Sequence, residues 1–229
     1  MLRQAQNTPE QLKNILEEII SVQTGNDFVM FEIRAVAPIT AAKKYTGISA
    51  SIVASIKNTR TPFGIDFGVG DIIVPKSEKR EIPTQLDDFV APMVNTYSIE
   101  TTVAEKTDAI LSLMEFSSRM KDYYDIYYLA NKFDFEGEVL AEALKKTFAN
   151  RERCFTNEQF ERVMGFADDM DMQKKWKAFI RKADAKTDDY SEVLKTIETF
   201  LIKPLTAAIE DKSFKAQWAA SKNQWNDEM

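Results

Sequence analysis

The chain has 229 residues, of which 44% are hydrophobic and 29% charged, and its formal net charge at pH 7 is −6. This composition is typical of a globular protein of one or two domains, and the acidic balance argues against a general nucleic-acid coat. The sequence has no histidine and one cysteine, Cys154, which excludes internal disulfides, histidine-dependent nucleophiles and the usual zinc sites. Any chemistry therefore depends on carboxylates, lysines and tyrosines, and carboxylates suit Mg²⁺ or Mn²⁺.

The targeting features of the sequence are those of a cytoplasmic protein. No apolar run approaches roughly 18 residues, the length of a membrane-spanning helix, and the first residues show no signal-peptide pattern. A single cysteine suits a reducing compartment. We therefore expect a cytoplasmic location and no membrane partner.

The first hundred residues have the texture of short strands, because most glycines and prolines of the chain lie there and such residues separate strands. An amphipathic helix is predicted at 9–22, with Thr8 as its N-cap and Pro9 at its first position. Strands are predicted at 28–37, at 47–56 and within 63–74, the last stretch holding one strand or two.

From Glu100 onwards, apolar residues recur with a helical period. Helices are predicted at 100–116, 117–133, 137–149, 156–168, 171–184 and 190–222, the last broken or kinked near Pro204. The sequence thus predicts an α+β fold with a mainly antiparallel or mixed sheet. Residues 1–100 are expected to form the sheet-containing core and residues 101–229 a helical domain.

Asp66 interrupts the apolar strand sequence FGIDF. Burying an unpaired carboxylate is costly, so we expect Asp66 to meet a cation or to hold a metal ion at the end of the strand. Gly64, Gly68 and Gly70 remove side chains around it and permit close approach of backbone or ligand. The alternative is a strand followed by a tight turn that Asp71 caps.

Two consecutive predicted helices add charges of both signs. Lys106 lies near a helix start, where a lysine meets an anion drawn to the helix dipole or else extends to water. In the next helix, Asp122 and Asp125 are spaced i, i+3, and Lys121 and Asp125 i, i+4, beside Arg119. An ordinary intrahelical ion pair beside a core stripe is the alternative. Together these groups suit a nucleotide site, with carboxylates for a metal ion and cations for phosphates.

Three segments, IDFGVGDIIVP, YSIETTVAEKTDAI and SSRMKDYYDIYYLA, resemble in this order the AbiEii nucleotidyltransferase family, the toxins of AbiE-type abortive-infection toxin–antitoxin systems. The resemblance covers roughly residues 25–150 and implies a polymerase-β-like nucleotidyltransferase sheet followed by a helical bundle. It implies that Asp66 is the metal-binding carboxylate of the family's second motif and that Lys106 is the phosphate-contacting lysine of the third. Lys121 and Asp125, with Asp122 beside them, match the fourth motif.

The resemblance implies transfer of a nucleotide from an NTP, GTP by analogy, to an RNA or protein acceptor. Mg²⁺ or Mn²⁺ is the expected cofactor, and Lys106, Arg119 and Lys121 are expected to contact the triphosphate. An antitoxin protein is an expected partner.

One departure from the family pattern bears on activity. The family's first motif, a Gly-Ser or Gly-Gly-Thr turn followed by an Asp-x-Asp pair, has no counterpart before Gln23. We therefore expect a chain that begins downstream of that motif, with little nucleotidyl transfer and with a sheet edge whose exposure favours a homodimer. Two alternatives remain open: a non-catalytic remnant that binds nucleotide or antitoxin, and a helical interaction module with the strands as scaffold.

Overall fold

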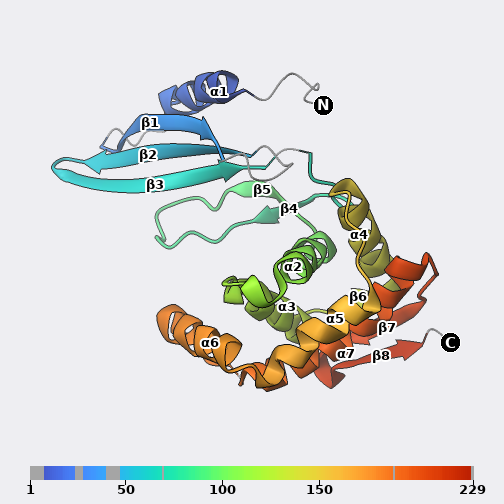
Figure 1. Cartoon of the computed structure of the whole chain (residues 1–229). Helices are drawn as coiled ribbons and strands as arrows, with labels where there is room; N and C mark the ends of the chain where they lie inside the picture. The colour runs from blue at the N-terminus through green and yellow to red at the C-terminus, as the bar shows by residue number, and fades with distance from the viewer. Residues whose placement is uncertain (1–7, 24–27, 40–46, 69, 188, 228–229) are drawn as a thin grey trace. The chain divides into compact units, whose positions relative to one another are not determined.

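The computed structural model describes residues 8–23, 28–39, 47–68, 70–187 and 189–227. These residues fall into two compact units, one ending at Asp71 and the other beginning at Ile72 (Figure 1). Both units combine helices with antiparallel strands, so the fold is α+β, as predicted. The expected division at residue 100, between a nucleotidyltransferase-like core and a helical domain, stays a prediction.

The first unit is a three-stranded antiparallel sheet with one helix. Its elements are α1 (Pro9–Ser21), β1 (Met30–Pro38), β2 (Ile48–Ile56) and β3 (Thr59–Phe67), and the strand order is β1-β2-β3. The predicted cap of α1 is confirmed, since the Thr8 side chain accepts a hydrogen bond from the Gln11 backbone N at 3.2 Å. The strand or strands predicted within 63–74 amount to β3 alone among the described residues, and beyond β3 the backbone bends at Gly70, whose φ of 89° is not that of a strand.

The alternation of side chains along the strands gives this sheet two different faces. Leu16 of α1 is buried against Ala50 and Ile52 of β2, so α1 covers the face that these residues share. On the other face, β2 and β3 place Ser49 opposite Asp66 and Ser51 opposite Gly64. Asp66 therefore lies on the face of small and polar residues, away from α1.

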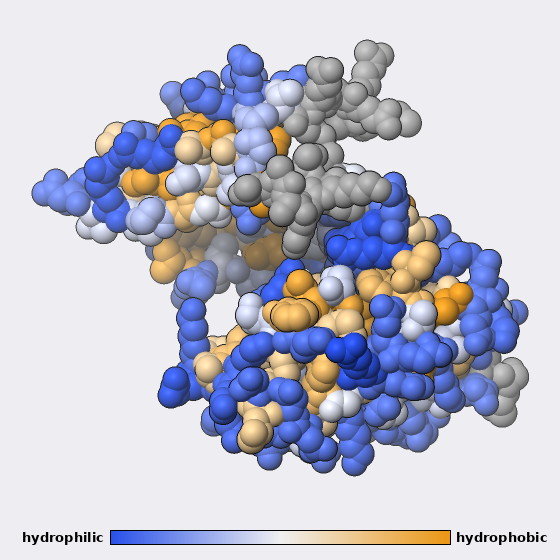
Figure 2. All heavy atoms as spheres, viewed as in Figure 1, coloured by the Kyte–Doolittle hydropathy of each residue, from blue (hydrophilic) through white to orange (hydrophobic). Residues whose placement is uncertain are grey.

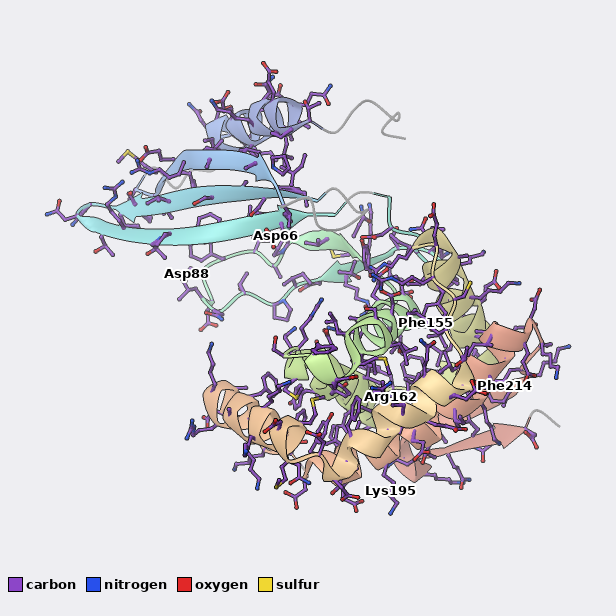
Figure 3. All side chains as sticks on the ribbon, in the orientation of Figure 1. Asp66, Asp88, Phe155, Arg162, Lys195 and Phe214 are labelled. Atoms are coloured by element: carbon purple, nitrogen blue, oxygen red, sulfur yellow. The ribbon has the colours of Figure 1, made fainter. Side chains whose placement is uncertain are left out.

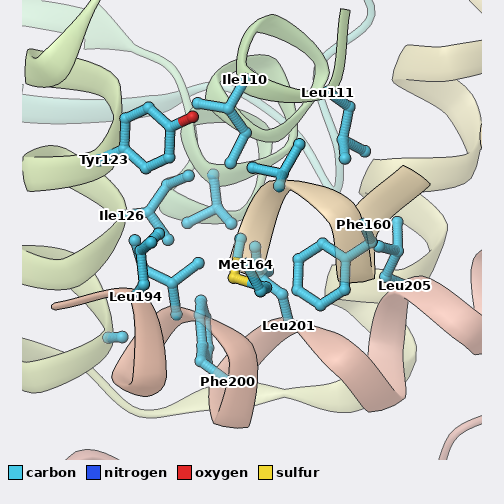
Figure 4. Close-up of a cluster of buried hydrophobic side chains, with 14 of the residues drawn as sticks. Ile110, Leu111, Tyr123, Ile126, Phe160, Met164, Leu194, Phe200, Leu201 and Leu205 are labelled. Atoms are coloured by element: carbon cyan, nitrogen blue, oxygen red, sulfur yellow. The ribbon is translucent and has the colours of Figure 1, made fainter. Parts of the chain in front are cut away.

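The second unit contains the helices α2 (Ile99–Leu113), α3 (Met120–Lys132), α4 (Gly137–Asn150), α5 (Asn157–Met164), α6 (Met170–Ala183) and α7 (Tyr190–Glu210). Their apolar faces meet in one core, which takes Ile110 from α2, Ile126 from α3, Phe160 from α5 and Phe200 from α7 (Figure 4). All four side chains are fully buried. This core fixes the helices that carry the candidate site residues.

Two small antiparallel sheets belong to the same unit. One pairs β4 (Glu78–Glu81) with β5 (Met93–Thr96), and the other orders β6 (Phe135–Glu136), β7 (Ala216–Ala219) and β8 (Gln224–Asp227) as β6-β7-β8. None of these strands is predicted from the sequence. Each is at most four residues long, which is too short for alternation to be distinguished from loop.

The prediction of one helix over 190–222 is wrong in its last third. Helix α7 runs through Pro204 and ends at Glu210, and Asp211 follows in the left-handed region with φ 54°. The chain then forms β7 and β8, where Trp218 and Trp225 pack on Phe200 with ring centroids 5.0 and 6.0 Å from it. Burial of two indole rings outweighs the helix propensity of the neighbouring alanines.

The outer rim of the second unit is mainly hydrophilic in the space-filling view (Figure 2). In the described part of the chain, no helix combines the length and the apolar character that crossing a membrane demands.

Candidate functional site

A cluster of charged side chains joins α2 to α3. The Nζ atom of Lys106 lies 2.5 Å from Asp125 Oδ2 and 3.3 Å from Asp122 Oδ1. Arg119 Nε lies 2.7 Å from Asp122 Oδ2, and Lys121 Nζ lies 3.1 Å from Asp125 Oδ2. The structure thus brings together five of the six predicted site residues. We call Lys106, Arg119, Lys121, Asp122 and Asp125 the α2–α3 charge cluster.

The exposure of the side chains in the α2–α3 charge cluster increases from the core toward the solvent. Asp122 is 2% exposed, whereas Lys106 and Asp125 are 18% and 21% exposed. The outer cations, Arg119 and Lys121, are 56% and 72% exposed. Three cations against two carboxylates leave one net positive charge, and the ends of the two exposed cations can reach an anion in solvent.

Helix α2 begins earlier than the sequence indicates, and this changes the setting of Lys106. Ser98 is the N-cap, and its hydroxyl accepts from Thr101 N at 3.1 Å. Ser98 also donates to the Val74 carbonyl, while Val74 N donates to Thr101 Oγ1 at 2.8 Å. Lys106 therefore lies in the middle of the helix, where the N-terminal dipole is weak. The carboxylates of α3, rather than the helix start, hold its ammonium group.

The start of α3 is fixed by contacts that the sequence does not predict. Arg119 is its N-cap residue, and the Ser117 hydroxyl accepts from Arg119 N at 3.1 Å. From α6, Lys175 donates to the carbonyls of Glu115 and Ser117 at 3.2 and 2.9 Å. Arg162 of α5 pairs with the Glu115 carboxylate at 2.7 Å. Two later helices thus hold the turn that orients Arg119.

A second charged group on α2 is absent from the sequence-based site. The fully buried Asp108 pairs with Arg151 and Arg153, which follow α4, and Arg151 also pairs with Glu105. The sequence does indicate that Asp108 is unusual, because this acid interrupts the apolar run of α2 just as Asp66 interrupts β3. These ion pairs fasten α4 to α2 on a flank other than that of Lys106.

Asp66, the sixth predicted residue, lies near the end of β3 in the first unit (Figure 3). Its side chain is exposed, and its expected role as the partner of a cation or the ligand of a metal ion stays a prediction. The exposure follows from the two-residue period of the strand, which places Asp66 with Ser49 on the face opposite α1. The convergence of Asp66 with the α2–α3 charge cluster stays a prediction, because the two belong to different units.

The donor atoms around Asp66 bear on the expected metal ion. Carboxylate and hydroxyl oxygens of Asp66, Ser49 and Ser51 are hard ligands of the kind that Mg²⁺ and Mn²⁺ take. Within the residues that the structure describes, however, no three acidic or cysteine side chains gather closely enough to bind a metal ion. Among the described residues of the first unit, Asp66 is therefore not part of a ready metal site.

Comparison with known proteins adds one finding. The model of the family described as "Nucleotidyl transferase AbiEii toxin, Type IV TA system" matches residues 2–203. The match extends well beyond residues 25–150, on which the resemblance rests, and includes the whole α2–α3 charge cluster and Asp66. Searches of curated proteins and of solved structures gave no match. The α+β fold agrees with the polymerase-β-like architecture that the family implies. The chain therefore belongs to the AbiEii nucleotidyl transferase toxin family of type IV toxin–antitoxin systems.

Proposed function

We propose that this toxin-family chain binds a nucleoside triphosphate through the α2–α3 charge cluster and supports at most slow metal-dependent nucleotidyl transfer, because Asp66 alone offers too few ligands for the metal ions. The observation that carries the proposal is the excess of cations held by two carboxylates of one helix. Asp122 and Asp125 fix Lys106 at 3.3 and 2.5 Å, so a phosphate meets an ammonium group that is already oriented. Preorganised cations of this kind are the main protein contribution to phosphoryl transfer.

Each residue of the cluster has a proposed role. Lys106 contacts the phosphates, and Arg119 and Lys121 extend the same positive surface toward the triphosphate from their exposed positions. Asp122 and Asp125 position these cations rather than react. Asp66 is the proposed carboxylate for Mg²⁺ or Mn²⁺, which would neutralise charge on the phosphates when bound. GTP is the proposed donor, an RNA or a protein the acceptor, and an antitoxin protein the partner.

Nucleotide binding can be tested by calorimetric titration with GTP, ATP and inorganic tripolyphosphate in the presence of Mg²⁺. The Lys106→Met variant removes one charge-assisted contact, which corresponds to about 10-fold weaker binding or more. Lys195→Met is the matched control, since Lys195 is an exposed lysine on α7, outside the cluster (Figure 3). Equal affinities of the Lys106→Met variant and the unchanged chain would refute the proposed phosphate contact.

Transfer is assayed separately, with labelled NTPs, Mg²⁺ or Mn²⁺ and a cell extract that contains RNA and protein. Asp66→Asn should abolish any label transfer that the unchanged chain shows, whereas the exposed Asp88→Asn should retain it. Binding without transfer would identify a nucleotide-binding protein rather than an enzyme. Failure to bind any of the three ligands would leave the helical interaction module as the better description.

A further inference from the structure

The surface beside the α2–α3 charge cluster is aromatic. Tyr124 and Tyr128 of α3 are spaced i, i+4, and their rings stack with centroids 6.3 Å apart and an interplanar angle of 23°. Tyr128 is 46% exposed. Lys121 lies three and seven residues before these two tyrosines, so all three occupy one flank of the helix.

The two tyrosines are the outer end of a row of aromatic rings. Helix α6 packs against α3 (Figure 1), and Tyr124 contacts Phe179 of α6 with ring centroids 5.8 Å apart. Phe179 contacts Trp176 at 5.7 Å, and Trp176 contacts Tyr190 of α7 at 5.6 Å. Trp176 and Tyr190 are both 3% exposed. The row therefore runs from the core to the surface and supports the Tyr128 ring from beneath.

An exposed tyrosine by itself is ordinary on a protein surface. Two features distinguish Tyr128: its ring is stacked on a supported neighbour, and cations lie on either side of it along α3. Lys132 follows it by one turn, and Lys121 precedes it by two turns, about 10 Å at 1.5 Å per residue. A rigid aromatic face next to cations is the arrangement that binds an unpaired nucleobase together with its phosphates.

We propose that Tyr124 and Tyr128 form a stacking platform for an unpaired nucleobase whose phosphates meet the α2–α3 charge cluster. The inference rests on the proposed function for the phosphate contacts, and it adds a base-recognising surface to that site. The base belongs either to the nucleoside triphosphate or to a single-stranded end of an RNA acceptor. In both cases the base presents the same aromatic face to Tyr128. Removing the Tyr128 ring distinguishes them, because only the ligand that supplies the base then binds more weakly.

The test compares Tyr128→Leu, which removes the ring, with Tyr128→Phe, which keeps it. Phe133→Leu is the matched control, because Phe133 is an exposed aromatic residue directly after α3 and outside the row. Each variant is titrated with GTP, with a single-stranded oligoribonucleotide and with tripolyphosphate, which has no base. A 2-aminopurine riboside triphosphate reports stacking directly, since its fluorescence falls when the base stacks on an aromatic ring.

We expect Tyr128→Leu to bind GTP or the oligoribonucleotide about 5-fold more weakly or worse, with tripolyphosphate binding unchanged. Tyr128→Phe and Phe133→Leu should bind both ligands as the unchanged chain does. Loss with GTP assigns the base to the triphosphate, and loss with the oligoribonucleotide alone assigns it to the acceptor. Unchanged binding of both ligands by Tyr128→Leu overturns the platform but not the phosphate site. If the unchanged chain binds neither GTP nor tripolyphosphate, the proposed function is refuted. If it does not bind the oligoribonucleotide either, the stacking platform is refuted together with the proposed function.

Discussion

Asp122 shows how the chain keeps a carboxylate in its core. At 2% exposure it has lost nearly all of its water, and Lys106 and Arg119 replace that solvation from two sides. The buried Asp122 carboxylate in turn restricts the positions of the two cations. A single residue thereby links the stability of the second unit to the geometry of its candidate site.

Because burial differs within the cluster, Asp122→Ala should destabilise the chain more than Lys121→Ala. Asp122→Ala should lower the free energy of unfolding by about 1–3 kcal/mol, because it removes the buried acceptor that Lys106 and Arg119 share, while Lys106 keeps its contact with Asp125. Lys121→Ala should change it by less than about 1 kcal/mol, since its ion pair with Asp125 ends at the solvent rim. Asp125→Ala also removes the contact with Lys106, so it should cost more than Lys121→Ala. Urea unfolding of the three variants measures all of these values. A loss of about 3 kcal/mol for Lys121→Ala would mark that pair as a structural bridge instead.

Two buried tyrosines make the stability of the chain sensitive to alkaline pH. Burial raises the pKa of Tyr123 to about 12, with part of the rise offset by the Tyr190 hydroxyl and some added by Asp122. Burial and the adjacent Tyr123 raise the pKa of Tyr190 as well. Tyrosines of an unfolded chain ionise near pH 10, so the unfolded state releases protons that the folded state retains. Stability should therefore be unaffected below about pH 10 and fall as the pH rises toward about 12.

Urea unfolding at a series of pH values from 8 upwards tests this expectation. Tyr123→Phe should flatten the decline above pH 10 or so, because it removes one of the two shifted groups. Tyr128→Phe, at an exposed tyrosine, should leave the decline as it is. Equal slopes in the Tyr123→Phe variant and the unchanged chain would contradict the assignment.

The identities of the site residues follow from the sequence, but their surroundings do not. Asp122 and Asp125 stand out through their local i, i+3 spacing, and Lys106 through the family resemblance, but the contact of Lys106 with both carboxylates crosses two helices. The burial of Asp108 and the exposure of Asp66 depend on which face of an element meets another, and neither spacing nor composition specifies that. Lys175 could not be assigned to the α2–α3 turn at all, since it lies 58 residues beyond Ser117.

At the scale of elements, the helices with strong periodicity are predicted within a few residues, and the short strands are missed. The third sheet explains one such failure. Gly137, the first residue of α4, lies so close to the segment before β7 that an added Cβ would be 2.6 Å from Phe214 Cδ1 and 2.8 Å from Phe214 O. A contact of this kind between distant segments leaves no local pattern in the sequence.

The same contact predicts that Gly137→Ala is destabilising. The new methyl group would displace a backbone carbonyl as well as a ring, at a cost of about 1–3 kcal/mol. Gly165→Ala is the control, because a Cβ there meets no atom within 4 Å, and its effect should stay within about 0.5 kcal/mol. Thermal and urea unfolding give both values. A neutral Gly137→Ala variant would show that the Phe214 segment shifts without loss.

At the scale of the whole molecule, the chain consists of two units with separate cores. The larger core joins α2, α3, α5 and α7, and the smaller one joins α1 to its sheet. The family match covers parts of both units. The sequence indicates a part rich in glycine and proline followed by a helical part, but it does not indicate the boundary between the compact units. The loop and hairpin from 72 to 98 resemble the first part in composition and belong to the second unit. The expected homodimer and antitoxin contacts stay predictions.

Helix α3 is held in place by residues that the ribosome adds much later, so a newly made chain contains its motif residues before it can orient them. The turn before α3 is held by Lys175, 60 residues beyond Glu115, and the far end of α3 by Trp218, whose indole donates to the Ala130 carbonyl 88 residues earlier at 2.7 Å. At about 5–20 residues per second, the ribosome finishes these supports several seconds after α3 itself. A nascent toxin therefore carries its motif residues for that interval without the contacts that orient them, and any activity that depends on them starts only after Trp218 has been made.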